Sequence, residues 1–245
     1  MSGVGIVAAL RAESRLLGPV RARRGSCAVL ADGTLLVVSG MGLAAAGEGA
    51  RRLVPAGARA LVSFGMAGGL DPRLVAGSIV LPSEVVSSDG AHFATTGHWR
   101  EHVGAAVGAR HPVCFGALLS CRQAIGSVAD KAEVFRNTAA AAVDMESAAV
   151  AEVATSERLP FLAVRAIVDT ASDSLPPALV EVIGPGGAAR IGRVLALLAR
   201  RPADLGLLFQ LLRRYRAARR ALATVARCGA LALHAGDPRS EGVGT

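Results

Sequence analysis

The stretch Ala142-Val-Asp-Met-Glu-Ser-Ala-Ala-Val-Ala151 places two carboxylates, Asp144 and Glu146, inside a run of small and apolar residues. Residues 139–143 have the pattern of a short buried strand and residues 146–154 that of a helix. The acids therefore lie at a strand-to-helix junction, where open α/β sheets bind their ligands. A buried carboxylate without a partner costs several kcal/mol, so the acids need either the helix N-terminus or a ligand with hydroxyl groups. This stretch alone favours the helix N-terminus.

Strand-like and helix-like patterns alternate on both sides of the junction. The apolar runs typical of strands are residues 5–10, 35–39, 60–64, 78–81, 113–119, 140–143 and 161–168. The patterns typical of helices are residues 43–53, 99–107, 128–137 and 147–158. This alternation predicts an α/β fold around a mixed, largely parallel sheet.

The length of 245 residues suits one α/β domain followed by a separate C-terminal part. The expected parts are a domain over 1–187, a basic amphipathic helical extension over 188–235 and a flexible tail over 236–245. Their boundary is expected at Pro176-Pro177 or at the Gly184-Pro-Gly-Gly187 turn.

Positive charge is concentrated near the C-terminus. The net charge is +8, and residues 190–227 hold ten arginines and one acid, Asp204, which leaves −1 for the rest of the chain. Arginines interleaved with leucines predict contact with a membrane surface or another anionic partner. The alternative is a solvated helix face in a chain whose 27 basic residues include only one lysine. Nucleic acid is not an expected partner, because aromatic residues make up only 3% of the chain.

The cysteines and histidines indicate neither a disulfide framework nor a metal site. Four cysteines form no CxxC pair and four histidines between residues 92 and 111 form no catalytic triad or ligand pattern. We therefore expect no metal and a cytoplasmic setting. The apolar N-terminal run lacks the basic region of a signal peptide, and no apolar run reaches the ~18 residues of a membrane span.

Residues capable of chemistry recur at the ends of successive predicted strands. Glu13 follows the first strand, Gly40-Met-Gly42 the second, and Gly65-Met-Ala-Gly-Gly-Leu70 the third, while Asp169 ends the last. Glycines let backbone N–H groups approach an anion at a helix N-terminus, although a GxG pair alone is also typical of a plain tight turn. Their recurrence at the same ends of the strands predicts one shared site.

Five stretches together resemble the superfamily of purine nucleoside phosphorylases and methylthioadenosine/S-adenosylhomocysteine nucleosidases. They are Gly5-Ile-Val-Ala-Ala-Leu-Arg-Ala-Glu13, Ser39-Gly-Met-Gly42, Gly65-Met-Ala-Gly-Gly-Leu70, Val143-Asp-Met-Glu-Ser147 and Val164-Arg-Ala-Ile-Val-Asp169. They occur in the family's order over roughly residues 3–175. The resemblance implies a three-layer fold with helices on both faces of the sheet, a homo-oligomer, and no cofactor beyond inorganic phosphate as a candidate co-substrate.

The resemblance also implies roles for the acids. Cleavage of a purine N-glycosidic bond passes through a ribosyl cation, and the leaving base must gain a proton. Asp169 is implied as the acid that protonates purine N7, and Glu13 as the group that activates water or organises the nucleophile. Glu146 is implied to bind the ribose 2′- and 3′-hydroxyls, with Met145 packed against the sugar. Asp144 is left with a structural role.

The remaining implied site residues act through support or through the backbone. Arg165 would support the strand end that carries Asp169. Ala67 and Gly68, together with Gly40 and Gly42, would line the nucleophile side.

Some positions depart from the family's pattern. Val168 stands where the nucleosidases have a serine, and Met66 where they have serine or threonine. The stretch Ser120-Cys-Arg-Gln-Ala-Ile125 lacks their purine-stacking phenylalanine. The phosphate-binding arginine of the glycine loop is also missing, and Arg122 or Arg11 are candidates to replace it.

Features near the C-terminus narrow the resemblance to the hopanoid-associated phosphorylase branch. They are Asp130-Lys131, Leu175-Pro-Pro177 and the helical extension with Leu198-Ala-Arg-Arg-Pro202. That branch implies adenine release from adenosylhopane at the cytoplasmic face of the membrane, through the basic C-terminal helices. The alternatives are a soluble methylthioadenosine/S-adenosylhomocysteine nucleosidase and a non-catalytic, membrane-peripheral binding protein.

Overall fold

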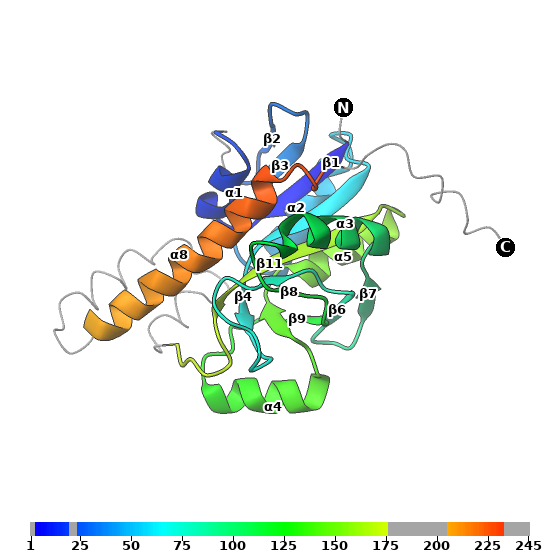
Figure 1. The fold of residues 1–245 in the computed structure, drawn as a ribbon. Helices are drawn as coiled ribbons and strands as arrows, with labels where there is room; N and C mark the ends of the chain where they lie inside the picture. The colour runs from blue at the N-terminus through cyan, green and yellow to red at the C-terminus, as the bar shows by residue number, and fades with distance from the viewer. Residues whose placement is uncertain (1–2, 20–23, 176–204, 233–245) are drawn as a thin grey trace.

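A computed structural model describes residues 3–19, 24–175 and 205–232 of the chain (Figure 1). The predicted boundary between residues 176 and 187 and the tail over 236–245 lie outside these ranges. The helices are α1 (Arg11–Leu17), α2 (Leu43–Leu53), α3 (Gly97–Gly108), α4 (Val128–Thr138), α5 (Ser147–Ser156) and α8 (Leu205–Arg227).

The described strands form one eleven-stranded mixed sheet. They are β1 (Val4–Ala8), β2 (Cys27–Val29), β3 (Leu35–Val38), β4 (Ala60–Gly69), β5 (Ile79–Val80), β6 (Glu84–Ser87), β7 (His92–Ala94), β8 (Val113–Cys114), β9 (Leu118–Ser120), β10 (Ala142–Asp144) and β11 (Phe161–Asp169). The order along the main path is β2-β3-β1-β4-β10-β9-β6-β7, and β11 joins β4 to β5. Strands β1 and β11 run parallel to β4, and β10 runs antiparallel to it. This confirms the predicted α/β class.

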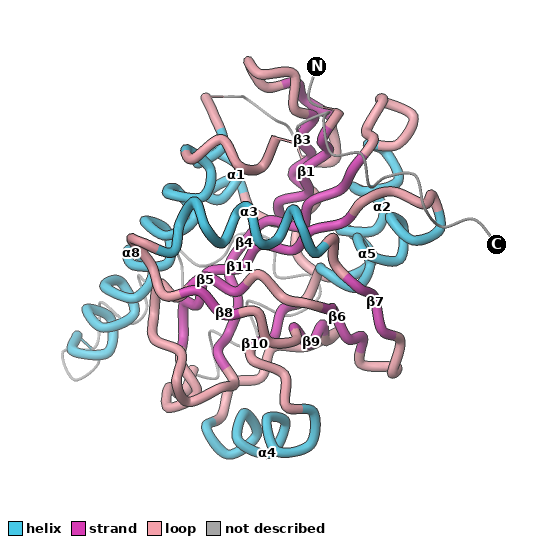
Figure 2. The backbone as a smooth tube through the Cα atoms, turned by 45° about the vertical axis from the view of Figure 1, so that its right-hand side comes forward, coloured by secondary structure: helices cyan, strands magenta, loops and turns pink. Residues whose placement is uncertain are grey.

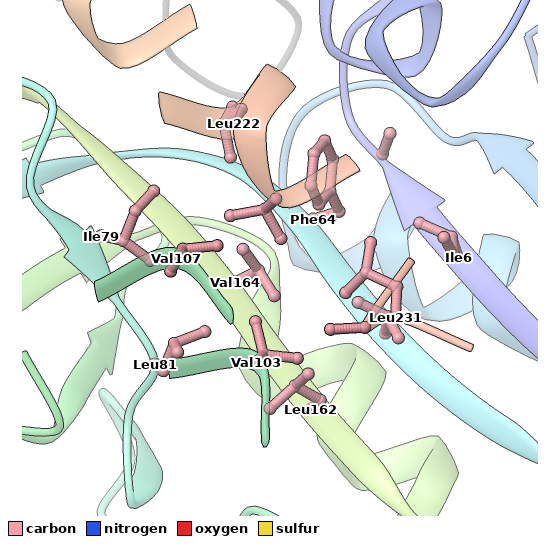
Figure 3. Close-up of a cluster of buried hydrophobic side chains, with 14 of the residues drawn as sticks. Ile6, Phe64, Ile79, Leu81, Val103, Val107, Leu162, Val164, Leu222 and Leu231 are labelled. Carbon is pink, nitrogen blue, oxygen red and sulfur yellow. The ribbon is translucent and has the colours of Figure 1, made fainter. Parts of the chain in front are cut away.

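Two apolar layers cover the two faces of the sheet. Alternate residues of a strand point to opposite faces, so Val62 and Leu61 of β4 enter different clusters. One layer holds α3 and α8 and is shown in Figure 3, where Phe64 and Val164 lie among side chains from both helices. The other layer holds α2 and α5. The fold is therefore three-layered, as the resemblance implies.

Two predicted strands differ from those observed. The run 113–119 is divided into β8, which pairs with β5, and β9, which pairs with β10 and β6. Between them, at Gly116, an added Cβ would lie 2.8 Å from the Ala141 side chain. The predicted strand 60–64 continues through Gly69, since β11 pairs with β4 from Leu61 to Gly68 and β10 pairs with Gly68 and Gly69. The glycine stretch that was expected to be a loop is therefore the end of a long strand.

Helix α8 belongs to the core as well as to the basic C-terminal region. Ala218, Ala221, Leu222 and Val225 follow helical spacing along one face and are fully buried. This face packs on β11, α1 and α3. In Figures 1 and 2 the Leu205 end projects beyond the strands. The predicted extension is thus, over residues 205–227, a helix whose second half completes one layer of the fold.

Candidate active site

A buried ion pair fixes the junction between β10 and α5. The Arg165 side chain is 2% exposed and donates from Nε to Asp144 Oδ2 at 2.8 Å and from Nη2 to Ser63 Oγ at 2.6 Å. Asp144 also accepts from the Ser147 N–H at 3.1 Å, which caps the first turn of α5. Asp144 therefore has the helix-capping role, and Arg165 supports the junction by neutralising it.

Glu146, two residues later, does not cap α5 with its side chain. Its Oε1 accepts from the Gly42 N–H at 2.9 Å and its Oε2 from the Met145 N–H at 3.3 Å. Gly42 is the residue before α2 and has φ of +96°, a left-handed conformation that favours glycine. The predicted nucleophile-side glycine and the predicted sugar ligand are thus brought together. Met145 is buried beside them.

Glu13 reaches the same region from the first turn of α1. It is 3% exposed, and its Oε2 accepts from the Leu10 N–H at 2.9 Å while Oε1 accepts from the Met66 N–H at 3.0 Å. A Cβ added at Gly65 would lie 2.8 Å from Oε1, so the glycine makes room for the carboxylate. Glu13 is therefore held against β4 by backbone groups.

Asp169 ends β11 directly opposite Gly68 of β4. The register shifts between Ile167 and Asp169, which marks a β-bulge at Val168. The Asp169 carboxylate lies over Gly68, where an added Cβ would be 3.2 Å from Oδ2. Glu13 therefore contacts β4 at Met66 and Asp169 contacts it at Gly68, two residues further along the strand. Ala67, between these two contact points, is buried.

Lys131 is a site residue that the sequence reasoning gave no role. It lies on α4, is fully buried and donates from Nζ to Asp169 Oδ2. It also donates to the carbonyl oxygens of Thr170 at 2.9 Å and Asp173 at 3.0 Å. Its signal in the sequence is that it is the only lysine of the chain.

Burial raises the pKa of all three predicted site acids. It is the main cause for Glu13, where Arg165 and backbone N–H groups partly offset it. Burial, followed by the negative charge of Asp144, raises the pKa of Glu146 to about 7. Burial also raises the pKa of Asp169, against the lowering effect of the Lys131 ammonium. Such shifts suit groups that hold or exchange protons near neutral pH.

Gly40 lies against Arg24, and no described contact joins it to one of the three acids. Its φ is +93°, and a side chain there would overlap the guanidinium of Arg24. Arg24 donates from Nε to the Ser39 carbonyl oxygen at 3.2 Å. A cation thus contacts the glycine turn. No described contact brings Arg11 or Arg122, the two predicted substitutes for a phosphate-binding arginine, to it.

Within the described residues no three histidine, cysteine, aspartate or glutamate side chains group into a metal site.

The chain matches a protein-family model described as the phosphorylase superfamily over residues 27–200. The chain belongs to the phosphorylase superfamily. It is therefore an enzyme of the nucleosidase and phosphorylase class. No curated protein matches the chain.

Several solved structures share the superfamily fold. The 5′-methylthioadenosine/S-adenosylhomocysteine nucleosidase of Neisseria meningitidis, in complex with methylthio-immucillin-A, is 21% identical, with a TM-score of 0.65 over 91% of this chain and 97% of that chain. The corresponding Helicobacter pylori enzyme with butyl-thio-DADMe-Immucillin-A is 17% identical, with a TM-score of 0.65 over 92% and 94%. The futalosine hydrolase of Helicobacter pylori is 19% identical, with a TM-score of 0.59 over 68% and 87%.

Proposed function

We propose that the protein cleaves the purine N-glycosidic bond of a 5′-modified adenosine and releases adenine. The observation that carries this proposal is the convergence of three buried carboxylic acids, Glu13, Glu146 and Asp169, from three separate parts of the chain. Each has a pKa raised by burial. Family membership supports the same chemistry.

The proposed reaction divides the work between the two ends of the site. As the bond from C1′ to N9 breaks, its electrons pass to the purine and Asp169 gives its proton to N7. A water molecule attacks C1′ of the resulting ribosyl cation and passes a proton to Glu13. Because burial raises the pKa of Asp169, the acid is favoured to hold the proton that it must donate.

Glu146 is the proposed ligand of the ribose 2′- and 3′-hydroxyls. Two backbone N–H groups already orient its carboxylate, which leaves further lone pairs for hydroxyl donors. Met145 would pack against the sugar, and Arg165 would hold the strand end and the junction in register. Gly42, Ala67 and Gly68 would line the remaining wall through their backbone.

Replacement of the proposed acid tests the mechanism. Asp169→Asn keeps the shape of the side chain but cannot donate an acidic proton, so adenine release should fall by roughly 10²- to 10⁴-fold. Asp71→Asn is the matched control, since Asp71 is also buried but pairs with Arg73 rather than with a proposed site residue. Melting temperatures would verify that both variants fold. Full activity of Asp169→Asn would refute the assignment.

We further propose adenosylhopane as the substrate and the cytoplasmic membrane face as the place of action. The support is the resemblance of Asp130-Lys131 and of the C-terminal region to the hopanoid-associated branch. Helix α8 adds physical support. Phe209 is 70% exposed. Four of the arginines on α8 are exposed at positions 213, 216, 219 and 220. An open depression of about 300 Å³ lies between this helix and Thr170, the residue that follows Asp169 in the sequence.

The second candidate is a nucleosidase for methylthioadenosine or S-adenosylhomocysteine, which the names of the similar structures favour. Adenine release from the three substrates, measured side by side with and without inorganic phosphate, separates the candidates. We expect adenosylhopane to give the highest kcat/KM. Phosphate dependence would identify a phosphorylase, with Arg24 as the cation beside the glycine turn, and independence a hydrolase. In line with the family resemblance we also propose a homo-oligomer.

A further inference from the structure

We propose that Lys131 is the positioning residue of the catalytic acid: it holds one carboxylate oxygen of Asp169, so that the other oxygen carries the proton for the purine. This inference deepens the proposed function and rests on it for its catalytic part. Lys131 comes from α4, which lies apart from the helices that cover the sheet (Figures 1 and 2). Lys131 is the only lysine of the sequence, so no other lysine side chain can take its place.

The three donors of the ammonium match three oxygens. Nζ donates to Asp169 Oδ2, to the Thr170 carbonyl and to the Asp173 carbonyl. An ammonium has three N–H donors and no acceptor. A fully buried ammonium is tolerable only where each of its donors is bonded, and this arrangement bonds all three. Lys131 is therefore held in one orientation rather than filling space.

This geometry favours one oxygen of Asp169 for the proton. A hydroxyl oxygen is a weaker acceptor than the carbonyl oxygen of the same carboxylic acid, so a proton on Oδ2 would weaken the bond from the Lys131 N–H. A protonated Asp169 that keeps this contact at full strength carries its proton on Oδ1. Both oxygens lie against Gly68, where an added Cβ would be 3.5 Å from Oδ1, so the lack of a side chain there leaves room for the acid. Lys131 thus selects the oxygen that donates.

The charges around Asp169 come from three elements. Burial raises the pKa of Asp169, and the positive charge of Lys131 on α4 lowers it. The negative charge of Asp173, in the loop after β11, raises it further. Arg214 on α8 faces Asp173 rather than Asp169, with Nη1 2.6 Å from Asp173 Oδ1. Without Lys131, burial and the Asp173 charge would raise the pKa of Asp169 against the lowering effect of a backbone hydrogen bond alone. Its proton would then be retained to a higher pH.

The loop that holds Asp169 is fastened by other contacts as well. Asp173 Oδ2 accepts from the Thr170 N–H at 2.9 Å and from Thr170 Oγ1 at 2.8 Å. The Leu175 N–H donates to the Gly126 carbonyl oxygen at 2.8 Å, close to the start of α4. Loss of the ammonium should therefore change the acid while the loop keeps its path.

The pH profile of kcat/KM for adenine release is the first test. Asp169 must be protonated to act, so the rate falls as pH rises through its pKa. Lys131→Met should move this alkaline limb upward by about one to three pH units, the usual effect of removing an opposite charge at this range. It should also lower kcat at least tenfold. Lys131→Arg keeps the charge and should leave the limb near that of the wild type.

Ser127→Ala is the matched control for damage to α4. Ser127 caps that helix by accepting from the Asp130 N–H at 3.0 Å and does not contact Asp169. We expect its alkaline limb to stay in place. If Lys131→Met lowered the rate as Ser127→Ala does and left the limb unmoved, the lysine would have only a structural role and the proposal would be overturned.

A second measurement does not depend on turnover. The carboxyl ¹³C resonance of Asp169, assigned by its loss in Asp169→Asn, reports the titration of this group directly. Lys131→Met should raise its midpoint, whether or not the chain releases adenine. A wild-type protein inactive on every nucleoside would refute the proposed function, while an unmoved midpoint would refute the role of Lys131. If Lys131→Met does not fold, Lys131→Gln replaces it in both measurements.

Discussion

Asp144 and Glu146 stand two residues apart but bind different partners. Asp144 accepts from Arg165 and from the first turn of α5, so its acceptor capacity is used within the protein. Among the described residues, Glu146 accepts from two backbone N–H groups, one of them 104 residues away at Gly42. The local sequence favours a helix cap for both acids. The distinction comes from contacts distant in the chain, which no local pattern encodes.

Glu146 should cost the protein stability at neutral and alkaline pH. Its pKa is about 7 in the folded state against an ordinary value of 4.5. Between these values the folded state binds more protons than the unfolded chain, so the free energy of unfolding falls as pH rises through this window. Glu146→Gln cannot ionise. It should be more stable than the wild type at pH 8 by on the order of 2 to 3 kcal/mol, and nearly equal to it near pH 4.

Urea unfolding at a series of pH values measures this difference. Glu152→Gln is the control, because it removes a glutamate from the exposed face of the same helix. A Glu146→Gln difference that does not vary with pH would contradict the raised pKa of Glu146. At the same time the variant should bind ribose hydroxyls less well, since an anionic acceptor is lost.

Lys131 shows where sequence reasoning about a site stops. Glu13, Glu146 and Asp169 follow predicted strands, so their positions and the family resemblance identify them together. Lys131 is placed on a helix pattern at residues 128–137, where a lysine is ordinarily a solvated residue. Its burial depends on how α4 meets the loop from Asp169 to Asp173. Only the three-dimensional structure supplies that contact.

At the scale of elements, strong periodicity in the sequence predicts a helix correctly, whereas it does not predict the short strands. The helix at Leu43–Leu53 has the predicted bounds, because alanines and leucine recur on one buried face. The strands β2, β6 and β7 were missed, since each has only three or four residues and includes exposed or half-exposed positions. Their pairing with neighbouring strands, rather than their own pattern, defines them.

Helix α8 should be required for folding. Leu222 is fully buried between the helix and the sheet, in the cluster that Figure 3 shows with Phe64 and Val164. Leu222→Ala leaves a cavity there and should lower the free energy of unfolding by about 2 to 5 kcal/mol. Arg219→Ala, on the exposed side of the same helix, should change it by no more than about 0.5 kcal/mol.

Chemical denaturation of the two variants measures this contrast. Equal and small effects would mean that α8 is not part of the folding unit. A large effect at Leu222 also has a practical consequence. Removal of the whole C-terminal region would unfold the layer that covers β11, so its binding role has to be tested by point substitutions on its exposed face.

At the scale of the whole molecule, the excess positive charge is concentrated near the C-terminal end of the sequence. The body of the chain is nearly neutral, and ten of the arginines lie between residues 190 and 227. No helix in the described ranges is long and apolar enough to cross a membrane. The membrane contact proposed above would use the exposed Phe209 and the exposed arginines of α8, with the apolar ring in the interface and the guanidinium groups on anionic headgroups.

Vesicle co-sedimentation of the full chain tests this contact. We expect binding to vesicles containing phosphatidylglycerol at low salt, weaker binding at 0.5 M salt because of screening, and little binding to phosphatidylcholine alone. Each arginine near an anionic surface contributes roughly 1 kcal/mol, so the triple change Arg213→Gln, Arg216→Gln and Arg220→Gln should lower partitioning on the order of a hundredfold.

The triple variant spares the buried face of α8 and Arg214, which pairs with Asp173. Its turnover of methylthioadenosine, a substrate that needs no membrane, should match the wild type if the protein accepts it at all. Phe209→Ser should weaken binding at both low and high salt, because its contribution is apolar and is not screened. Equal partitioning of the wild type and the triple variant, or equal binding to charged and neutral vesicles, would exclude an electrostatic contact between α8 and the membrane. The basic helix would then be a solvated face, which is the alternative that the arginine-rich composition leaves open.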